Sequence, residues 1–101
     1  MKDFDKLQIT IGEWSDSEFG KRNSAIGCLN HLLEEVEEIK NDPSDIVEFA
    51  DAYMLLSDSA RISGFTMSQV HDAVLDKLEI NKKREWKLDV ESGLIKHVKE
   101  D

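Results

Sequence analysis

Apolar residues recur every three or four positions along this chain, which is the spacing of one face of an α-helix. In the first segment Phe4, Leu7, Ile11 and Trp14 are separated by polar residues. Three later segments keep the same period, and none alternates apolar and polar residues as a half-buried strand does. The pattern therefore predicts four helices, over about residues 2–17, 24–41, 44–63 and 66–86.

Capping and helix-breaking residues separate these segments. Asn41-Asp42-Pro43 ends the second, and Gly64 ends the third. Thr66 and Gln69 fit a capping box at the start of the fourth. Residues 87–101 are mostly polar, and we expect an irregular tail with a short helical turn around residues 94–98. Short links between helices predict an all-α four-helix bundle, as one domain over residues 1–101.

Composition narrows the class of protein. The chain has 101 residues, 40% of them hydrophobic and 35% charged, which suits one small globular domain. The net charge of −9 argues against direct nucleic-acid binding, because phosphate neutralisation needs clustered Lys and Arg. A single Cys excludes an internal disulfide and a cysteine-type zinc site. No apolar run suits a signal peptide or a membrane span, so we expect a cytoplasmic protein without membrane contact.

Acidic residues are paired on the second and third predicted helices. Glu35 and Glu38 are three positions apart, as are Glu48 and Asp51, so each pair shares one helix face beside the apolar stripe. Because the break at residues 41–44 folds the two helices back on each other, we expect the four carboxylates to converge. Such oxygen ligands suit Mg²⁺, with Mn²⁺ as the alternative. A non-catalytic acidic interaction module, such as a phage adaptor or a DNA mimic, stays open.

A basic stripe lies on the fourth predicted helix. Lys77, Asn81 and Arg84 have i, i+4, i+7 spacing. Such side chains bind the oxygens of a polyphosphate that a metal ion leaves free. The alternative is positive charge that stabilises the end of a helix.

These motifs together resemble a known family. Glu34-Glu35-Val36-Glu37-Glu38 followed by Glu48-Phe49-Ala50-Asp51 is similar to the acidic signature of MazG-like all-α nucleoside triphosphate pyrophosphatases. Lys77, Asn81, Arg84 and Trp86 are similar to the later motif of that superfamily. The stretch from Trp14 to Arg22 resembles its dATP/dGTP pyrophosphohydrolase branch. Phosphoribosyl-ATP pyrophosphohydrolases of the same superfamily are less similar.

The resemblance implies a reaction and roles for individual residues. A (deoxy)nucleoside triphosphate, dATP or dGTP in the nearest branch, would be hydrolysed between its α- and β-phosphates, and the enzyme would be a homodimer or homotetramer. The metal ligands would be Glu35, Glu38, Glu48 and Asp51, with Glu38 or Glu35 acting on the attacking water. The substrate would be held by Lys77, Asn81 and Arg84, and Trp14 would stack on the base or join the core. The metal ligands would be contacted and oriented by three neighbouring residues, Glu34, His31 and Asp58. Alternatively, Asp58 pairs with Arg61.

Overall fold

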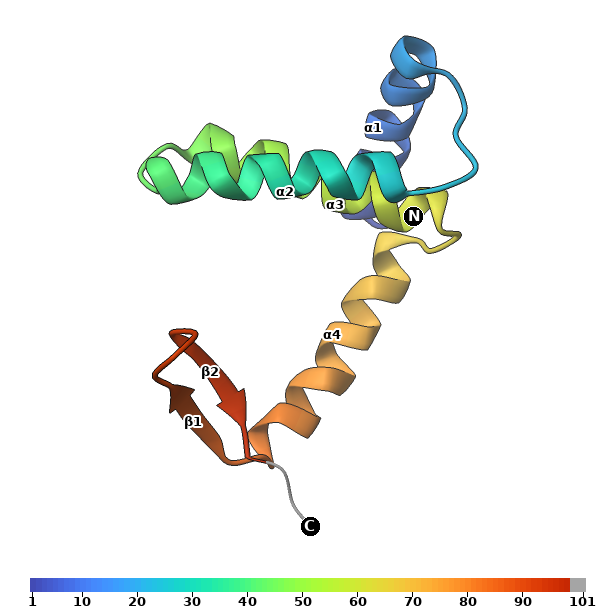
Figure 1. Cartoon of the computed structure of the whole chain (residues 1–101). Helices are drawn as coiled ribbons and strands as arrows, with labels where there is room; N and C mark the ends of the chain where they lie inside the picture. The colour runs from blue at the N-terminus through green and yellow to red at the C-terminus, as the bar shows by residue number, and fades with distance from the viewer. Residues whose placement is uncertain (99–101) are drawn as a thin grey trace. The chain divides into compact units, whose positions relative to one another are not determined.

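The computed structural model describes residues 1–98 of the chain. Within these residues the chain forms four helices and then a small hairpin, drawn in Figure 1, and the all-α four-helix fold class is confirmed. The elements are α1 (Asp3–Phe19), α2 (Ile26–Asn41), α3 (Ile46–Ile62), α4 (Met67–Lys82), β1 (Trp86–Asp89) and β2 (Leu94–His97). They form two compact units, one over Met1–His71 and the other from Asp72 onward. The single domain over residues 1–101 stays a prediction, and residues 99–101 lie outside the described part.

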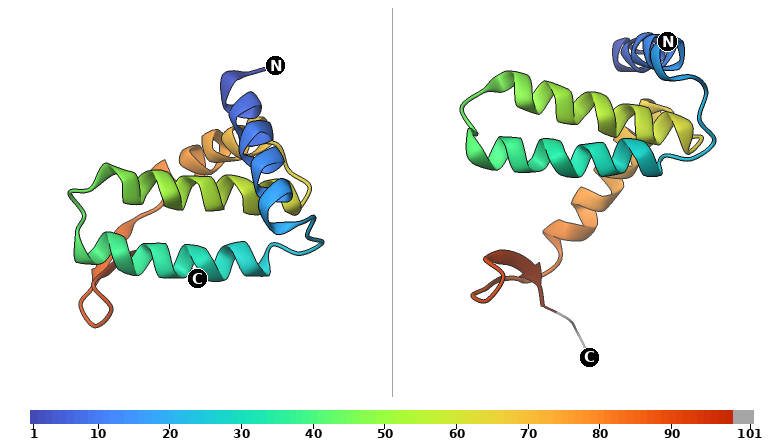
Figure 2. Two further views of the ribbon diagram at one scale, coloured as in Figure 1. Left: turned by 90° about the horizontal axis from the view of Figure 1, so that it is seen from above. Right: turned by 45° about the horizontal axis from the view of Figure 1, so that its top comes forward.

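The helices α2 and α3 form an antiparallel pair, which Figure 2 shows from two sides. The reversal depends on Asp42, whose Oδ1 accepts hydrogen bonds from the backbone N–H of Ser44 at 3.2 Å and from its hydroxyl at 2.6 Å. Asp45 then caps α3 by accepting a hydrogen bond from the N–H of Val47 at 3.0 Å. The short turn therefore brings the end of α2 opposite the start of α3, as the sequence predicted.

Helix α1 crosses the other end of this pair, near the start of α2 and the end of α3 (Figures 1 and 2). Gln8 of α1 is only 4% exposed and holds α1 against the end of α3 by hydrogen bonds. Its amide nitrogen donates to the carbonyls of Ser57 at 3.1 Å and Phe65 at 3.0 Å, and its oxygen accepts from the N–H of Met67 at 3.1 Å. One buried amide thus satisfies three backbone groups at the junction of α3 and α4.

The start of α4 is capped twice. Thr66 and Gln69 exchange the two hydrogen bonds of the predicted capping box, at 2.9 and 3.1 Å. Asp5 of α1 accepts a hydrogen bond from the N–H of Ser68 at 2.8 Å and another from its hydroxyl. A carboxylate is favourable at this position because helix N-termini carry partial positive charge.

The prediction that the fourth helix continues to residue 86 is wrong. Helix α4 ends at Lys82, so Arg84 follows the helix and does not extend a stripe along it. The indole nitrogen of Trp86 donates to the carbonyl of Asn81 at 2.9 Å, and the N–H of Arg84 donates to the same oxygen at 3.2 Å. These bonds close the chain into a turn, which ends the helix although the residues themselves are compatible with its continuation.

The prediction of an irregular tail with a helical turn near residues 94–98 is also wrong. Strands β1 and β2 pair antiparallel, with Trp86 opposite His97 and Asp89 opposite Leu94. Gly93 supplies the left-handed backbone conformation of the connecting turn, with φ of 72°. Each strand has four residues, which is too short for a two-residue period to stand out from the sequence.

None of the helices within residues 1–98 combines the length and the apolar composition that a membrane crossing requires.

Candidate functional site

Three of the four predicted metal ligands meet where the end of α2 faces the start of α3. Glu35, Glu38 and Glu48 each offer a carboxylate oxygen, and these oxygens lie within 4.8 Å of one another. Glu35 is 8% exposed, Glu48 is half-buried and Glu38 is exposed, so the cluster is open to solvent on one side. Asp51 follows Glu48 on α3 and shares a cavity with Glu35. The structure therefore brings together three of the four carboxylates that the i, i+3 pairs predicted to converge, and Asp51 lies outside this cluster.

Electrostatics in this cluster favour a bound cation or proton. Burial and the negative charge of Glu38 raise the pKa of Glu35. A hydrogen bond with Glu38, together with burial, raises the pKa of Glu48 to about 7. One oxygen of Glu35 and one of Glu48 are buried without a hydrogen-bond partner among the described residues. Two unsatisfied buried carboxylate oxygens fit a divalent cation, which prefers oxygen ligands and neutralises their repulsion.

Lowering the pH from 8 to 6 is expected to raise the thermal unfolding midpoint of the metal-free protein. The pKa of Glu48 is about 7 in the folded state and near 4.5 when unfolded. A raised folded-state pKa gives stability that is fully present below the unfolded value and is lost as pH rises through the folded value. Thermal unfolding in EDTA across pH 5–8 measures this slope, and Mg²⁺ should reduce it by replacing the proton. An unfolding midpoint that stays constant from pH 6 to 8 in EDTA contradicts the prediction.

The predicted supporting residues occupy different positions. His31 lies one turn before Glu35 on α2, and its Nε2 is 3.3 Å from Glu35 Oε1, so it contacts the cluster directly. Glu34 is exposed. Asp58 lies seven residues beyond Asp51 along α3, at the other end of the cavity, and pairs with Arg61 at 2.7 Å.

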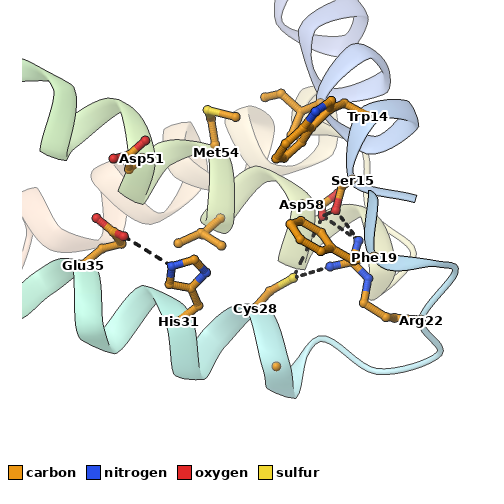
Figure 3. A pocket seen from close by; sticks show the side chains of 13 residues that line it. Trp14, Ser15, Phe19, Arg22, Cys28, His31, Glu35, Asp51, Met54 and Asp58 are labelled. Carbon is orange, nitrogen blue, oxygen red and sulfur yellow. Dashed lines mark hydrogen bonds and ion pairs between the residues drawn. The ribbon is translucent and has the colours of Figure 1, made fainter. Parts of the chain in front are cut away.

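A cavity of about 470 Å³ extends from the carboxylates toward α1 (Figure 3). Its volume is within the range of about 300–1,000 Å³ that small-molecule sites occupy. Glu35 and Asp51 line what we call the carboxylate end. Trp14, Phe19 and Arg22 line the opposite, aromatic end. Trp14 is 52% exposed and meets Phe19 edge to face, with ring centroids 5.5 Å apart, so it lines the cavity and is not a core residue.

A buried ion-pair network closes the aromatic end, as Figure 3 shows in part. Asp58 is 3% exposed and accepts hydrogen bonds from Ser15 at 2.7 Å, Arg61 at 2.7 Å and Arg22 at 3.1 Å. Burial alone would raise the pKa of Asp58, but these hydrogen bonds and the two guanidinium charges lower it. Arg61 also pairs with Asp16 of α1 at 3.0 Å. The network therefore joins α1, the α1–α2 link and α3 behind the cavity.

The predicted phosphate-binding residues belong to the second unit. Lys77 is exposed, whereas Asn81 and Arg84 are half-buried. Asn81 Oδ1 is buried without a hydrogen-bond partner among residues 1–98. No ion pair within that same range involves Lys77 or Arg84.

The aromatic end contains residues to which the amino-acid sequence assigned no individual role. Ser15, Phe19, Arg22 and Gly27 line the cavity from α1, the link and α2. Only the resemblance of the Trp14-to-Arg22 stretch to a family pointed toward this end. No periodic signal marks Arg22 or Gly27, because their relation to Asp58 and to the cavity arises from the crossing of α1 over the helix pair.

Comparisons with known proteins show which proteins this chain is similar to. A protein of Salmonella phage P22 named Eaa is 41% identical over 96 residues, covering 95% of this chain. A dATP/dGTP diphosphohydrolase of Salmonella phage PMBT28 is 33% identical over 92 residues, covering 91%. The chain spans only 30% of the length of each of these curated relatives.

A solved structure of similar fold is the MazG-like pyrophosphohydrolase of cyanophage S-2L, bound to dGDP and three catalytic Mn²⁺ ions per active site. It is 29% identical, covers 98% of this chain and 100% of its own, and has a TM-score of 0.80. The sequence pattern of the dATP/dGTP pyrophosphohydrolase family matches residues 7–101. The chain belongs to the dATP/dGTP pyrophosphohydrolase family.

Proposed function

We propose that this protein hydrolyses deoxynucleoside triphosphates, preferentially dATP or dGTP, to the monophosphate and pyrophosphate with Mg²⁺ as cofactor. The observation that carries the proposal is the convergence of Glu35, Glu38 and Glu48 within 4.8 Å at one end of a cavity of nucleoside size. Mn²⁺ is the alternative metal, since the cyanophage relative holds Mn²⁺ with dGDP.

Different acidic residues of the cluster would bind the cation and accept the proton of the attacking water. Glu35, Glu38, Glu48 and Asp51 would hold the cation, which when bound neutralises phosphate charge and makes water more acidic. Glu38 is the exposed member of the cluster, so its carboxylate suits orienting the attacking water and accepting its proton, with Glu35 behind it. The bond from the water oxygen to the α-phosphorus forms as the bond from that phosphorus to the bridging oxygen of pyrophosphate breaks.

We assign the nucleoside and the oxygen atoms of the substrate to different groups of residues. The nucleoside would occupy the cavity, where the exposed ring of Trp14 offers a stacking surface for the base. Lys77, Asn81 and Arg84 would bind phosphate or sugar oxygens. The two cations suit phosphate oxygens because no ion pair among the described residues involves them. The Oδ1 of Asn81, which has no hydrogen-bond partner within residues 1–98, suits accepting a hydrogen bond from a sugar hydroxyl. Glu34 would act only through its negative charge, which adds to the electrostatic potential at the carboxylate cluster.

The experiment that tests the reaction is product analysis with the common NTPs and dNTPs, with Mg²⁺, Mn²⁺ or EDTA. Cleavage between the α- and β-phosphates yields a monophosphate and pyrophosphate, whereas cleavage at the γ-phosphate yields a diphosphate and phosphate. In ¹⁸O-labelled water, label in the monophosphate identifies attack at the α-phosphorus. Metal-dependent release that Glu38→Gln abolishes supports the proposal. No release from folded protein would favour a non-catalytic acidic module.

Lys77→Ala and Arg84→Ala test the phosphate-binding role separately. We expect KM for the triphosphate to rise with each, while the stabilisation by Mg²⁺ alone is unchanged, because the carboxylates are intact. Lys83→Ala is the matched control, a neighbouring exposed cation outside the motif. Equal effects of all three substitutions would indicate general attraction by positive charge instead of a specific contact.

We also propose that the protein is a homodimer or homotetramer and acts in the cytoplasm, where deoxynucleotides are made and used. The α2–α3 pair exposes several apolar side chains in the first unit, which supports association with a second copy. They are Leu29, Leu33, Val36, Phe49, Tyr53 and Leu56. A monomer by light scattering at micromolar concentration would contradict the oligomer.

A further inference from the structure

The cavity runs along α2, which lines it from the carboxylate end to the aromatic end. Gly27, His31 and Glu35 are four residues apart and all line the cavity from successive turns. At 1.5 Å per residue, the helix rises about 12 Å from Gly27 to Glu35. Glu35 lies at the carboxylate end, and Gly27 precedes Cys28, whose Sγ accepts a hydrogen bond from Arg22 at the aromatic end. Gly27 therefore lies along the helix axis away from the catalytic carboxylates.

Gly27 has no structural reason to be glycine within the part of the chain that the structure describes. Gly20, Gly64 and Gly93 have positive φ, and a Cβ at Gly12 would collide with the Arg61 guanidinium. Gly27 has ordinary helical geometry in α2, and a Cβ there would meet no heavy atom within 4 Å. Gly27 is the second residue of α2, and its backbone conformation is one that alanine adopts equally well. Since alanine restricts the unfolded chain more than glycine does, glycine here gives up about 0.4–1 kcal/mol of stability without relieving strain or crowding.

We propose that Gly27 is a specificity-determining residue, whose missing side chain leaves the aromatic end of the cavity large enough for a purine. This inference rests on the proposed function. The α-phosphate of the substrate must lie at the carboxylate end, so the nucleoside extends along α2 toward Gly27. A bicyclic purine reaches further along this path than a monocyclic pyrimidine. A side chain at position 27 shortens the cavity at the end where the two classes of base differ.

The test is the series Gly27→Ala and Gly27→Leu, assayed for kcat/KM with dATP, dGTP, dCTP and dTTP in Mg²⁺. The purine-to-pyrimidine ratio should fall in the order wild type, alanine, leucine, by about tenfold or more for leucine, since single methylenes in apolar pockets change selectivity by 10- to 200-fold. The change should lie mainly in KM, because the carboxylates are unaltered. Gly27→Ala should also raise the thermal unfolding midpoint by a few degrees, so activity and stability move in opposite directions.

Asn30→Leu is the matched control, because Asn30 is exposed on α2 and does not line the cavity. It should leave the purine-to-pyrimidine ratio unchanged. A constant ratio in folded Gly27→Leu overturns the inference and leaves the proposed function standing. Equal loss with all four nucleotides, or a changed oligomeric state, would assign Gly27 to packing or association and overturns it as well. If the wild-type protein cleaves none of the four, the proposed function fails and the inference fails with it.

Discussion

Glu48→Gln is expected to lower kcat/KM at least about 1,000-fold without destabilising the metal-free protein at pH 8. Metal catalysis supplies several kcal/mol of transition-state stabilisation, and about 4 kcal/mol corresponds to 1,000-fold in rate. The amide keeps the shape of the side chain but removes a charge, as protonation does. Since the pKa of Glu48 is raised to about 7 by its neighbours, removing this charge relieves repulsion with Glu35 and Glu38. The metal-free unfolding midpoint should therefore equal or exceed that of the wild type.

Pyrophosphate release and thermal unfolding, each with Mg²⁺ and with EDTA, measure the two halves of this prediction. The Mg²⁺-dependent rise in unfolding midpoint should be lost together with the activity, because both require the same ligand. Glu37→Gln is the control, since Glu37 is on α2, is exposed and pairs with Lys40 at 3.4 Å. Near-wild-type activity in Glu48→Gln would remove Glu48 from the metal ligands.

Asp58→Ala is expected to lower the free energy of unfolding by about 3 kcal/mol, at the lower end for loss of a buried ion-pair partner, because Asp16 still neutralises part of the guanidinium charge. Asp58 is 3% exposed, and its loss leaves Arg22, Arg61 and the Ser15 hydroxyl without their shared acceptor. For a domain of about 100 residues this corresponds to a fall of more than about 10 °C in the unfolding midpoint. Differential scanning calorimetry measures it. Activity should also fall, because Arg22 would lose its position at the aromatic end of the cavity.

Glu37→Ala serves as the control for ion-pair loss in general. It breaks the exposed Glu37–Lys40 pair, which contributes less than about 1 kcal/mol. Asp58→Asn retains one acceptor without the charge, and its midpoint should lie between those of Asp58→Ala and the wild type. If Asp58→Ala unfolds at the same temperature as Glu37→Ala, the network contributes no more than a surface ion pair.

Local sequence signals predicted the helix ends correctly where nearby residues determine the end. The capping box of Thr66 and Gln69 forms as expected, and the Asp42–Asp45 turn reverses the chain between α2 and α3. Prediction failed beyond Lys82, because the end of α4 depends on Trp86 and on pairing between β1 and β2. Such contacts join residues separated along the chain, and helical periodicity carries no information about them.

The same distinction applies to the site. The i, i+3 spacing of Glu35 with Glu38, and of Glu48 with Asp51, places each pair on one helix face whatever the rest of the fold does. With a short turn between the helices, the spacing was sufficient to predict that carboxylates would meet. The reaction and its substrate came from family resemblance, because spacing alone does not distinguish a catalytic site from an acidic surface.

The amino-acid sequence alone determined the helical class, the pairing of the carboxylates and the metal chemistry that they suit. All three depend on residues that lie within one helical turn or one short link of each other. The crossing of α1 over the α2–α3 pair was decided by tertiary structure. That crossing places Trp14, Phe19 and Arg22 at one end of a cavity and buries Asp58 among two guanidinium groups. These contacts join segments far apart in the chain, so packing alone, and no local pattern, determines them.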